Sequence, residues 1–285
     1  MLPIPTKIST YLQTLHIPAP DSHKGQNGKV LVIGGSELFH AASKWSLDVV
    51  SKFVDMVFYS SVDENNELVS QKLYKEAKEN FWNGIVLPRE KINEYCVEAD
   101  VIMIGPGMER TQETATFTNA LVSAFPEKKW VIDAGALQMI TPSLIPSASI
   151  LTPHHQEFSR LVENGFNQDS AIEKGVVVVL KGKEDRIFSS TLRTPNTPDA
   201  STTLNPLYPL LIAGGNAGMT KGGTGDVLAG VIAGLYATND ATTAAVVGSF
   251  INKRAGDSLY EQVGPYFNAS DLVQSVPKVL WESIK

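Results

Sequence analysis

Short apolar runs recur along the chain and alternate with segments whose apolar residues recur at helical spacing. The runs KVLVI at 29–33 and VIMI at 101–104 are apolar at nearly every position, which is typical of strands buried on both faces. Between such runs, 41–53 and 111–125 carry apolar residues at the spacing of helices packed on one side. The pattern therefore predicts an α/β fold, with a mostly parallel central sheet and helices on both faces.

The rest of the chain continues this alternation. We expect further strands at 56–60, 84–87, 130–132, 150–151 and 176–180, and further helices at 66–78, 226–260 and 271–281. The last helix should be interrupted near Pro277, which has no backbone N–H to donate. The run 186–189 follows 176–180 too closely for a crossover helix, so we expect an antiparallel pair there. The stretch 191–209 is rich in Thr, Pro and Asn and predicts a loop with at most one edge strand.

No repeat and no linker divides the chain, so we expect a proline-punctuated leader at 1–24 and a single domain at 25–285. No apolar stretch approaches the roughly 20 residues that span a bilayer, and the leader lacks the core of a secretory signal. Gly230 and Gly234 are expected to allow close packing between helices of a protein core. One cysteine, Cys96, excludes an internal disulfide and is typical of a cytoplasmic protein. We expect its acidic neighbours to raise its pKa and leave the thiol inert.

Composition excludes further classes of protein. Of the 285 residues, 43% are hydrophobic and 19% are charged, which is incompatible with a disordered chain. The formal net charge is −6, so we expect no nucleic acid as a partner, because such a protein needs surplus cations. We expect no membrane partner either.

Polar residues follow the predicted strands at their carboxyl ends, where ligands bind in open parallel sheets. Asp133 follows one strand, and either helps to hold magnesium or phosphates or caps a turn. His154 follows the next strand, and either contacts a ligand or makes a structural hydrogen bond within the turn. Both alternatives stay open for each residue.

The glycine-rich segment at 213–235 is the most informative part of the sequence. Gly222, Gly223, Thr224 and Gly225 lead directly into an apolar helix that has Asp226 at its start. Uncovered backbone N–H groups and a helix N-terminus together predict a phosphate site. Asp226 could there accept the proton of a hydroxyl group that attacks the terminal phosphate. The alternative is that Asp226 is only the N-cap of the helix.

Six segments in order resemble the ATP- or ADP-dependent NAD(P)H-hydrate dehydratases of the ribokinase-like superfamily. They are GKVLVIGGS at 28–36, IGPGM at 104–108, VIDAGAL at 131–137, LTPHHQEF at 151–158, VVLKG at 178–182, and GGTGD at 222–226, which follows an Asn-x-Gly-Met segment. Together they cover roughly residues 25 to 260. Each motif alone is a weak indication, but six motifs in the order of the family are specific.

The resemblance implies a lyase that repairs hydrated NADH and NADPH, using ATP or ADP and Mg²⁺. The nucleotide would phosphorylate the hydroxyl of the nicotinamide ring, and loss of phosphate would restore the double bond. The implied nucleotide-binding residues are Lys181, Gly182, Asn216, Gly223, Thr224 and Gly225, and the implied substrate-binding residues are Ala42, Gly107, His154 and Asp226. Asp226 would also be catalytic. Relatives form homo-oligomers, and the resemblance implies the same here.

The chain departs from the family pattern at several positions. Gly135 stands where a second aspartate is usual, and Lys183-Glu184-Asp185 replaces small residues and a threonine, which puts an acidic pair near the expected phosphates. Two alternatives therefore stay open. A small-molecule kinase of the same superfamily, acting on a thiazole or pyrimidine alcohol, would share the Gly-x-Gly-Asp loop. A catalytically weak nucleotide-binding relative would account for the departures.

Overall fold

The computed structural model describes residues 3–61, 75, 77–192 and 209–285. Most of the helix expected at 66–78 lies outside these residues, and so does most of the loop expected at 191–209. Within them, nine strands form one sheet in the order β3-β2-β1-β4-β5-β6-β7-β8-β9. The strands are β1 (Lys29–Ile33), β2 (Met56–Ser60), β3 (Ile85–Val86), β4 (Val101–Ile104), β5 (Lys129–Ile132), β6 (Ser149–Leu151), β7 (Val177–Leu180), β8 (Asp185–Phe188) and β9 (Leu210–Ile212).

Strand direction agrees with the sequence prediction. Strands β1 to β7 pair in parallel, whereas β8 is antiparallel to both β7 and β9. Helices join β1 to β2, β4 to β5, β5 to β6 and β6 to β7, and the antiparallel β7–β8 pair is joined by a short turn, as the connection length requires.

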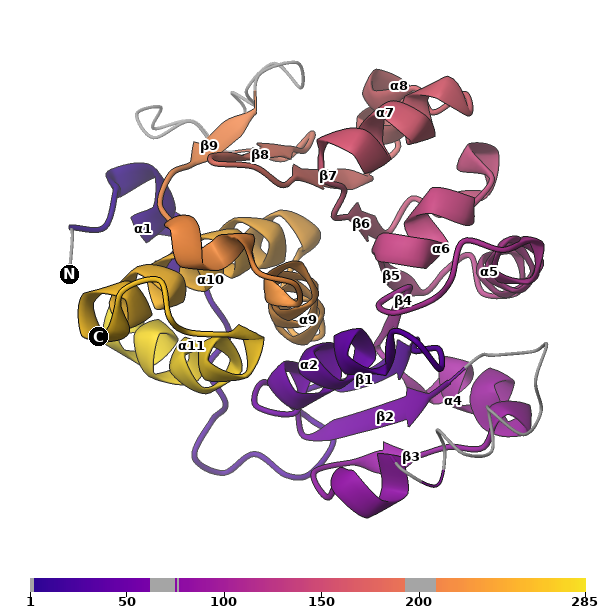
Figure 1. The fold of residues 1–285 in the computed structure, drawn as a ribbon, viewed down its shortest axis with the longest axis horizontal. Helices are drawn as coiled ribbons and strands as arrows, with labels where there is room; N and C mark the ends of the chain where they lie inside the picture. The colour runs from indigo at the N-terminus through magenta and orange to yellow at the C-terminus, as the bar shows by residue number, and fades with distance from the viewer. Residues whose placement is uncertain (1–2, 62–74, 76, 193–208) are drawn as a thin grey trace.

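Helices cover both faces of the sheet (Figure 1). One face carries α1 (Thr6–Gln13), α2 (His40–Val50), α9 (Thr224–Tyr236), α10 (Ala241–Val263) and α11 (Ala269–Ile284), and the other carries α4 (Ile92–Glu98), α5 (Gln112–Ala124), α6 (Ala134–Met139), α7 (His155–Glu163) and α8 (Gln168–Glu173). Short 3₁₀ turns occupy Arg89–Lys91, Pro142–Leu144 and Ala217–Thr220. Successive strand residues enter opposite hydrophobic cores: Val30 joins one core and Leu31 the other, and both are fully buried. The continuous apolar runs of the sequence are thus explained.

Helix α9 is the most buried helix of the structure and lies between α2 and α10. All of its residues from Val227 to Tyr236 are buried. A Cβ added at Gly230 would lie 2.5 Å from Cγ1 of Val49 in α2, so the absent side chain is what lets the two helices approach. The close packing expected of Gly230 and Gly234 is confirmed.

The two ends of the chain differ from expectation. Within the stretch expected as a leader, α1 buries Ile8, Tyr11 and Leu12 in the same core as α10 and α11. The boundary between leader and domain stays a prediction. The interruption expected near Pro277 is wrong, because α11 continues through this residue. Its buried neighbours Val276 and Val279 pack into the core and offset the missing backbone hydrogen bond.

Two smaller expectations can also be compared with the structure. Cys96 is a buried free cysteine on α4, and burial raises the pKa of its thiol to about 12 while the charge of Lys128 opposes the shift. The raised pKa is confirmed, but its main cause is burial rather than the acidic neighbours. Among the described residues, no helix has both the length and the apolar character that a membrane span needs.

The substitution Gly230→Ala tests the packing of α2 on α9. Alanine ordinarily stabilises a helix interior by about 1 kcal/mol relative to glycine. Here its Cβ would lie 2.5 Å from Val49 and 2.8 Å from the carbonyl oxygen of Ser46. We expect this overpacking to lower the free energy of unfolding by about 1–3 kcal/mol, measured by urea denaturation. Gly222→Ala is the control, because its Cβ would have no neighbour within 4 Å. A Gly230→Ala protein as stable as the wild type would contradict the packing argument.

Candidate active site

The loops that follow the parallel strands meet at one edge of the sheet and are tied together by backbone hydrogen bonds. The N–H of Gly35, after β1, donates to the carbonyl of Pro106, after β4, at 2.8 Å. The N–H of Gly135, after β5, donates to Gly105 at 3.3 Å, and Lys181 at the end of β7 donates to Pro153 at 2.8 Å. The strand-end residues singled out in the sequence therefore lie at one edge, as expected.

The phosphate loop expected at Gly223–Gly225 forms the start of α9. Gly223 is the N-cap, in a left-handed conformation with φ of 95°, and its Cα packs against the ring of Trp45. The hydroxyl of Thr224 donates to the carbonyls of Met219 and Lys221, at 2.8 and 3.0 Å, which holds the loop. Asp226 stands in the first turn of the helix. The alternative in which Asp226 is the N-cap is therefore wrong.

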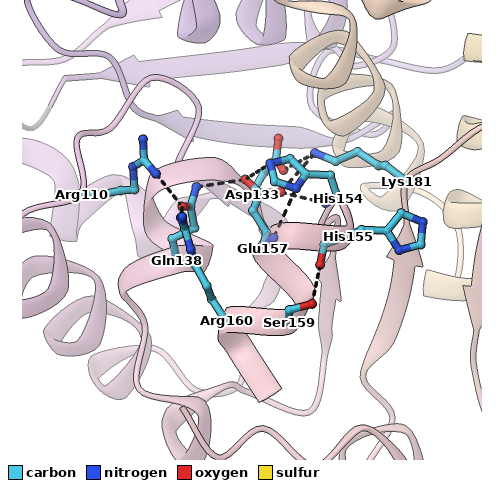
Figure 2. Close-up of polar contacts among 9 residues, drawn as sticks. All are labelled: Arg110, Asp133, Gln138, His154, His155, Glu157, Ser159, Arg160 and Lys181. Carbon is cyan, nitrogen blue, oxygen red and sulfur yellow. Dashed lines mark hydrogen bonds and ion pairs between the residues drawn. The ribbon is translucent and has the colours of Figure 1, made fainter. Parts of the chain in front are cut away.

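An ammonium group lies at the centre of the site, between buried carboxylates (Figure 2). The Nζ of Lys181 is 2.9 Å from Oδ1 of Asp133 and 4.0 Å from Oε2 of Glu157. Burial acts to lower the pKa of Lys181, but the charges of these two carboxylates and of Asp226 outweigh it and raise that pKa. Lys181 is thus a permanent cation, held next to the N-terminus of α9.

The same surroundings raise the pKa of the Asp226 carboxyl group. Its side chain is partly buried, and no other described residue donates a hydrogen bond to its two carboxylate oxygens. Burial first, and then the negative charge of Asp133, raise its pKa to about 7, while Lys181 opposes the shift. A carboxylate with a pKa near neutrality is suited to take up and release a proton.

His154 and Glu157 cap the start of α7 for each other. The Nδ1 of His154 accepts a hydrogen bond from the Glu157 N–H at 3.2 Å, and the carboxylate of Glu157 accepts one from the His154 N–H at 2.8 Å. Burial also raises the pKa of Glu157, with Lys181 opposing. Gln138 donates to Glu157 at 3.0 Å and accepts from Arg160 at 2.8 Å (Figure 2). The structural hydrogen bond considered for His154 is confirmed, and its contact with a substrate stays a prediction.

A cavity of about 560 Å³ adjoins the phosphate loop. Its lining includes these residues named from the sequence: His154, Lys181, Gly182, Asn216, Thr224 and Gly225. The side chain of Asn216 is held by two hydrogen bonds within the protein. Its Nδ2 donates to Asp257 at 3.0 Å, and its Oδ1 accepts from the Gly218 N–H at 2.9 Å. The residues implied for the nucleotide are thus brought together, apart from Gly223, which is not part of the lining.

Of the residues implied for the substrate, Ala42 and Gly107 are not part of this lining, whereas His154 is. The hydroxyl of Ser46 on α2 is 2.9 Å from the Asp226 carbonyl and 3.3 Å from the Ala42 carbonyl, so Ala42 is near the start of α9. Gly107 has a φ of 73°, and a Cβ there would lie 2.3 Å from the carbonyl oxygen of Phe39. A close approach within the protein already requires this glycine, so its role toward a ligand stays a prediction.

The departures from the family pattern have structural explanations. Asp185 is buried, accepts from the Gly182 N–H at 3.0 Å and from Ser249 at 2.6 Å, and pairs with Lys253 at 3.2 Å. Of the acidic pair expected near the phosphates, Asp185 lines the cavity in an ion pair with Lys253, and Glu184 is not part of the lining, so its closeness to a phosphate stays a prediction. A Cβ at Gly135 would lie 2.1 Å from the carbonyl oxygen of Met108, so glycine is the residue that fits there.

Sequence analysis missed Lys253, which completes this cluster. Its Nζ also donates to the carbonyls of Gly182 and Lys183, at 3.0 and 3.2 Å. The one signal in the sequence is a lysine near the middle of α10 that follows a stretch without charged residues. Its partners lie about 70 positions earlier in the chain, so the signal does not indicate what the charge is for.

Comparisons with known proteins agree with this geometry. The chain is 35% identical over 94% of its length to a bifunctional NAD(P)H-hydrate repair enzyme of Methanocaldococcus jannaschii, of which it covers 51%. It is 30% identical to an ADP-dependent (S)-NAD(P)H-hydrate dehydratase of Nitrosopumilus maritimus, covering 96% of each chain. The chain thus spans about half the length of several of its curated relatives.

Solved structures show the same fold. A ribokinase-like superfamily protein of Enterococcus faecalis superposes with a TM-score of 0.74 at 24% identity, over 96% of this chain and 94% of that one. The ADP/ATP-dependent NAD(P)H-hydrate dehydratase of Bacillus subtilis, crystallised with ATP and Mg²⁺, superposes with a TM-score of 0.71 at 21% identity, over 97% of each chain. The fold is therefore ribokinase-like. Because the sequence model of the NAD(P)H-hydrate dehydratases matches residues 30–278, the chain belongs to that family.

Proposed function

We propose that this protein dehydrates hydrated NADH and NADPH, with ADP or ATP as the phosphoryl donor. The observation that carries the proposal is Asp226, a carboxylate with a pKa of about 7 that follows a glycine-rich phosphate loop directly. The relative from Nitrosopumilus maritimus, which matches over nearly its whole length and is named as ADP-dependent, supports the choice of reaction.

The reaction would begin with transfer of a phosphoryl group. The terminal phosphate of the nucleotide lies at the N–H groups of Gly223, Thr224 and Gly225, where the helix N-terminus favours negative charge. The hydroxyl oxygen of the hydrated ring attacks the phosphorus atom while Asp226 accepts the hydroxyl proton, and the shortened nucleotide leaves. The C–O bond then breaks, inorganic phosphate departs, and loss of a ring proton restores the double bond.

Lys181 would act beside this transfer without forming a covalent bond. Its Nζ is 3.5 Å from the point where a Cβ of Gly225 would lie, so its charge is next to the phosphate loop. Asp133 and Glu157 hold the ammonium in this position. A fixed cation beside the transferring group stabilises the charge that develops on its oxygens, and needs no rearrangement during the reaction.

Mg²⁺ fits the site only in combination with a nucleotide. The described residues contain no group of three or more His, Cys, Asp or Glu side chains that could hold a metal ion. Mg²⁺ is commonly bound by one or two carboxylates together with substrate phosphates. Asp133, the residue considered for magnesium in the sequence, is paired with Lys181 at 2.9 Å, so the phosphates would supply most of the ligands and Asp226 would stay free to accept the proton. The ion would reduce the negative charge of the phosphate oxygens.

A cytoplasmic location and a homo-oligomeric assembly are part of the same proposal. The single cysteine of the sequence favours the cytoplasm, and the resemblance to the family implies the homo-oligomer.

An assay with hydrated NADH tests the function. Protein, Mg²⁺ and either ADP or ATP are mixed with hydrated NADH, and the absorbance of the reduced nicotinamide is followed. We expect recovery of the absorbance with at least one of the nucleotides. No recovery with either would refute the proposal. Phosphorylation of a thiazole or pyrimidine alcohol would then indicate a small-molecule kinase, and nucleotide binding without turnover an inactive relative.

Asp226→Asn tests the assigned base. The amide keeps the size of the side chain but cannot accept the hydroxyl proton as a carboxylate does. We expect turnover to fall by about 10²-fold or more, with nucleotide affinity largely kept, in steady-state kinetics and calorimetry. The control is Asp48→Asn, a carboxylate on α2 that is paired with Lys44 outside the site. Near-normal turnover in Asp226→Asn would show that another group takes the proton.

The raised pKa of Asp226 also predicts how stability depends on pH. The folded state binds this proton more tightly than the unfolded state, because the pKa is about 7 in the fold against an ordinary value of 3.8. The wild type therefore loses stability through this group as the pH rises from about 4 to about 7. The asparagine side chain has no proton to lose, so Asp226→Asn does not suffer this loss of stability. We expect its free energy of unfolding to exceed that of the wild type at pH 8, and the difference to shrink toward pH 4. Urea denaturation at both pH values measures this. Equal stability at pH 8 would contradict the raised pKa.

A further inference from the structure

Two arginine side chains converge on one neutral oxygen atom beside the buried network (Figure 2). The Nη1 of Arg160 donates to Oε1 of Gln138 at 2.8 Å, and the Nη1 of Arg110 donates to the same oxygen at 3.4 Å. Both arginines are exposed, whereas Gln138 is half-buried on α6. Because they share one acceptor, the two guanidinium groups are held within a few ångströms of each other at the surface.

No carboxylate balances these two charges directly. In the part of the chain that the structure describes, neither arginine lies within ion-pair distance of an acidic side chain. Glu157 joins the network by accepting a hydrogen bond from Gln138, but its charge is shared with Lys181. Two cations so close together repel each other, and an anion between them would convert the repulsion into attraction. The pair is therefore suited to an anionic ligand.

The arginine pair lies beside residues that the family resemblance implies for the substrate. Arg110 comes three positions after Gly107 in the connection from β4 to α5, and Arg160 is on α7, whose N-cap is His154. The Nε2 of His154 is 3.6 Å from Oε1 of Glu157, the same oxygen that accepts the hydrogen bond from the glutamine. The anion that the pair would bind is thus expected to belong to the substrate rather than to the nucleotide.

The phosphate groups of the proposed substrate differ in how well they fit such a pair. Hydrated NADH and hydrated NADPH share a pyrophosphate, in which each phosphorus atom has two free oxygens and one negative charge. Hydrated NADPH has in addition a 2′-phosphate on the adenosine ribose, a monoester with three free oxygens and close to two charges at neutral pH. The planar fork of donors in arginine matches phosphate oxygens, and an arginine commonly accommodates the 2′-phosphate of NADP. Two arginines without a carboxylate partner favour this more highly charged group.

We propose that Arg110 and Arg160 bind the 2′-phosphate of hydrated NADPH and make the protein selective for it over hydrated NADH. This inference rests on the proposed function, because it requires the hydrated dinucleotide to extend from Asp226 past His154. Each guanidinium group has five N–H donors, and Gln138 engages one nitrogen of each. The remaining donors bind the phosphate oxygens while the glutamine keeps the two groups together.

Calorimetric titration with the two reduced coenzymes tests the assignment without relying on turnover. The full chain is first saturated with ADP and Mg²⁺, so that the nucleotide site is filled. It is then titrated with NADPH or with NADH, the products of the proposed reaction, which differ only in the 2′-phosphate. The same titrations are run on Arg110→Gln, on Arg160→Gln and on the control Arg186→Gln. The control removes the same charge from an exposed arginine of β8 that does not line the cavity.

We expect the wild type and Arg186→Gln to bind NADPH at least about tenfold more tightly than NADH. Arg110→Gln and Arg160→Gln should each weaken NADPH binding by about fivefold or more, and should leave NADH binding within about twofold of the wild type.

Equal binding of NADPH and NADH by the wild type would overturn the proposal, and this comparison does not depend on the folding of any variant. Unchanged NADPH binding in both arginine variants would also overturn it. An equal loss of affinity for the two coenzymes would refute the 2′-phosphate contact and assign the arginines to the shared pyrophosphate.

The titrations and the repair assay can fail separately. Selective NADPH binding through the two arginines without any repair of hydrated NADPH would refute the proposed function and leave the 2′-phosphate site standing. Repair of hydrated NADH and hydrated NADPH with equal kcat/KM would do the opposite.

Discussion

The arrangement of the site depends on one buried ammonium group. Lys181 is placed by β7, Asp133 by the end of β5 and Glu157 by the first turn of α7, so a single ion pair network joins three neighbouring connections. Burying one carboxylate such as Asp133 without a cation would be strongly unfavourable. The lysine therefore fixes the strand ends relative to one another and places its own charge beside the start of α9.

The same network explains how two carboxylates in one site differ. Asp133 lies 2.9 Å from the ammonium, whereas Asp226 has no such partner and lies in the field of Asp133. One carboxylate is engaged in an ion pair with Lys181, and the pKa of the other is raised to about 7. This difference in environment, rather than in residue type, separates a residue that holds the site from one able to exchange a proton.

Local patterns predicted most of the fold, including the glycine-rich start of α9. Continuous apolar strands such as 101–104 indicate a sheet covered on both faces, and glycines before an apolar helix indicate an anion site. The helix at 6–13 was missed because prolines on either side, such as Pro5 and Pro18, made the segment resemble a leader. The pairing of Asp185 with Lys253 was not predictable, because it joins residues 68 positions apart and depends on how α10 crosses the sheet edge. The burial that sets the pKa of Asp226 and of Cys96 likewise exists only in the folded chain.

The reversal of strand direction after β7 determines which parts of the chain can change. Because β8 runs back and β9 runs forward again, Asp185 and Ile212 are paired neighbours at the edge that holds the cavity. The turn after β7 and the segment after β9 both line the cavity at this edge. Phe188 and Leu210 lie at the other ends of these two strands, away from the cavity. Substitutions at those ends are therefore separated from the cavity lining by the length of the strands.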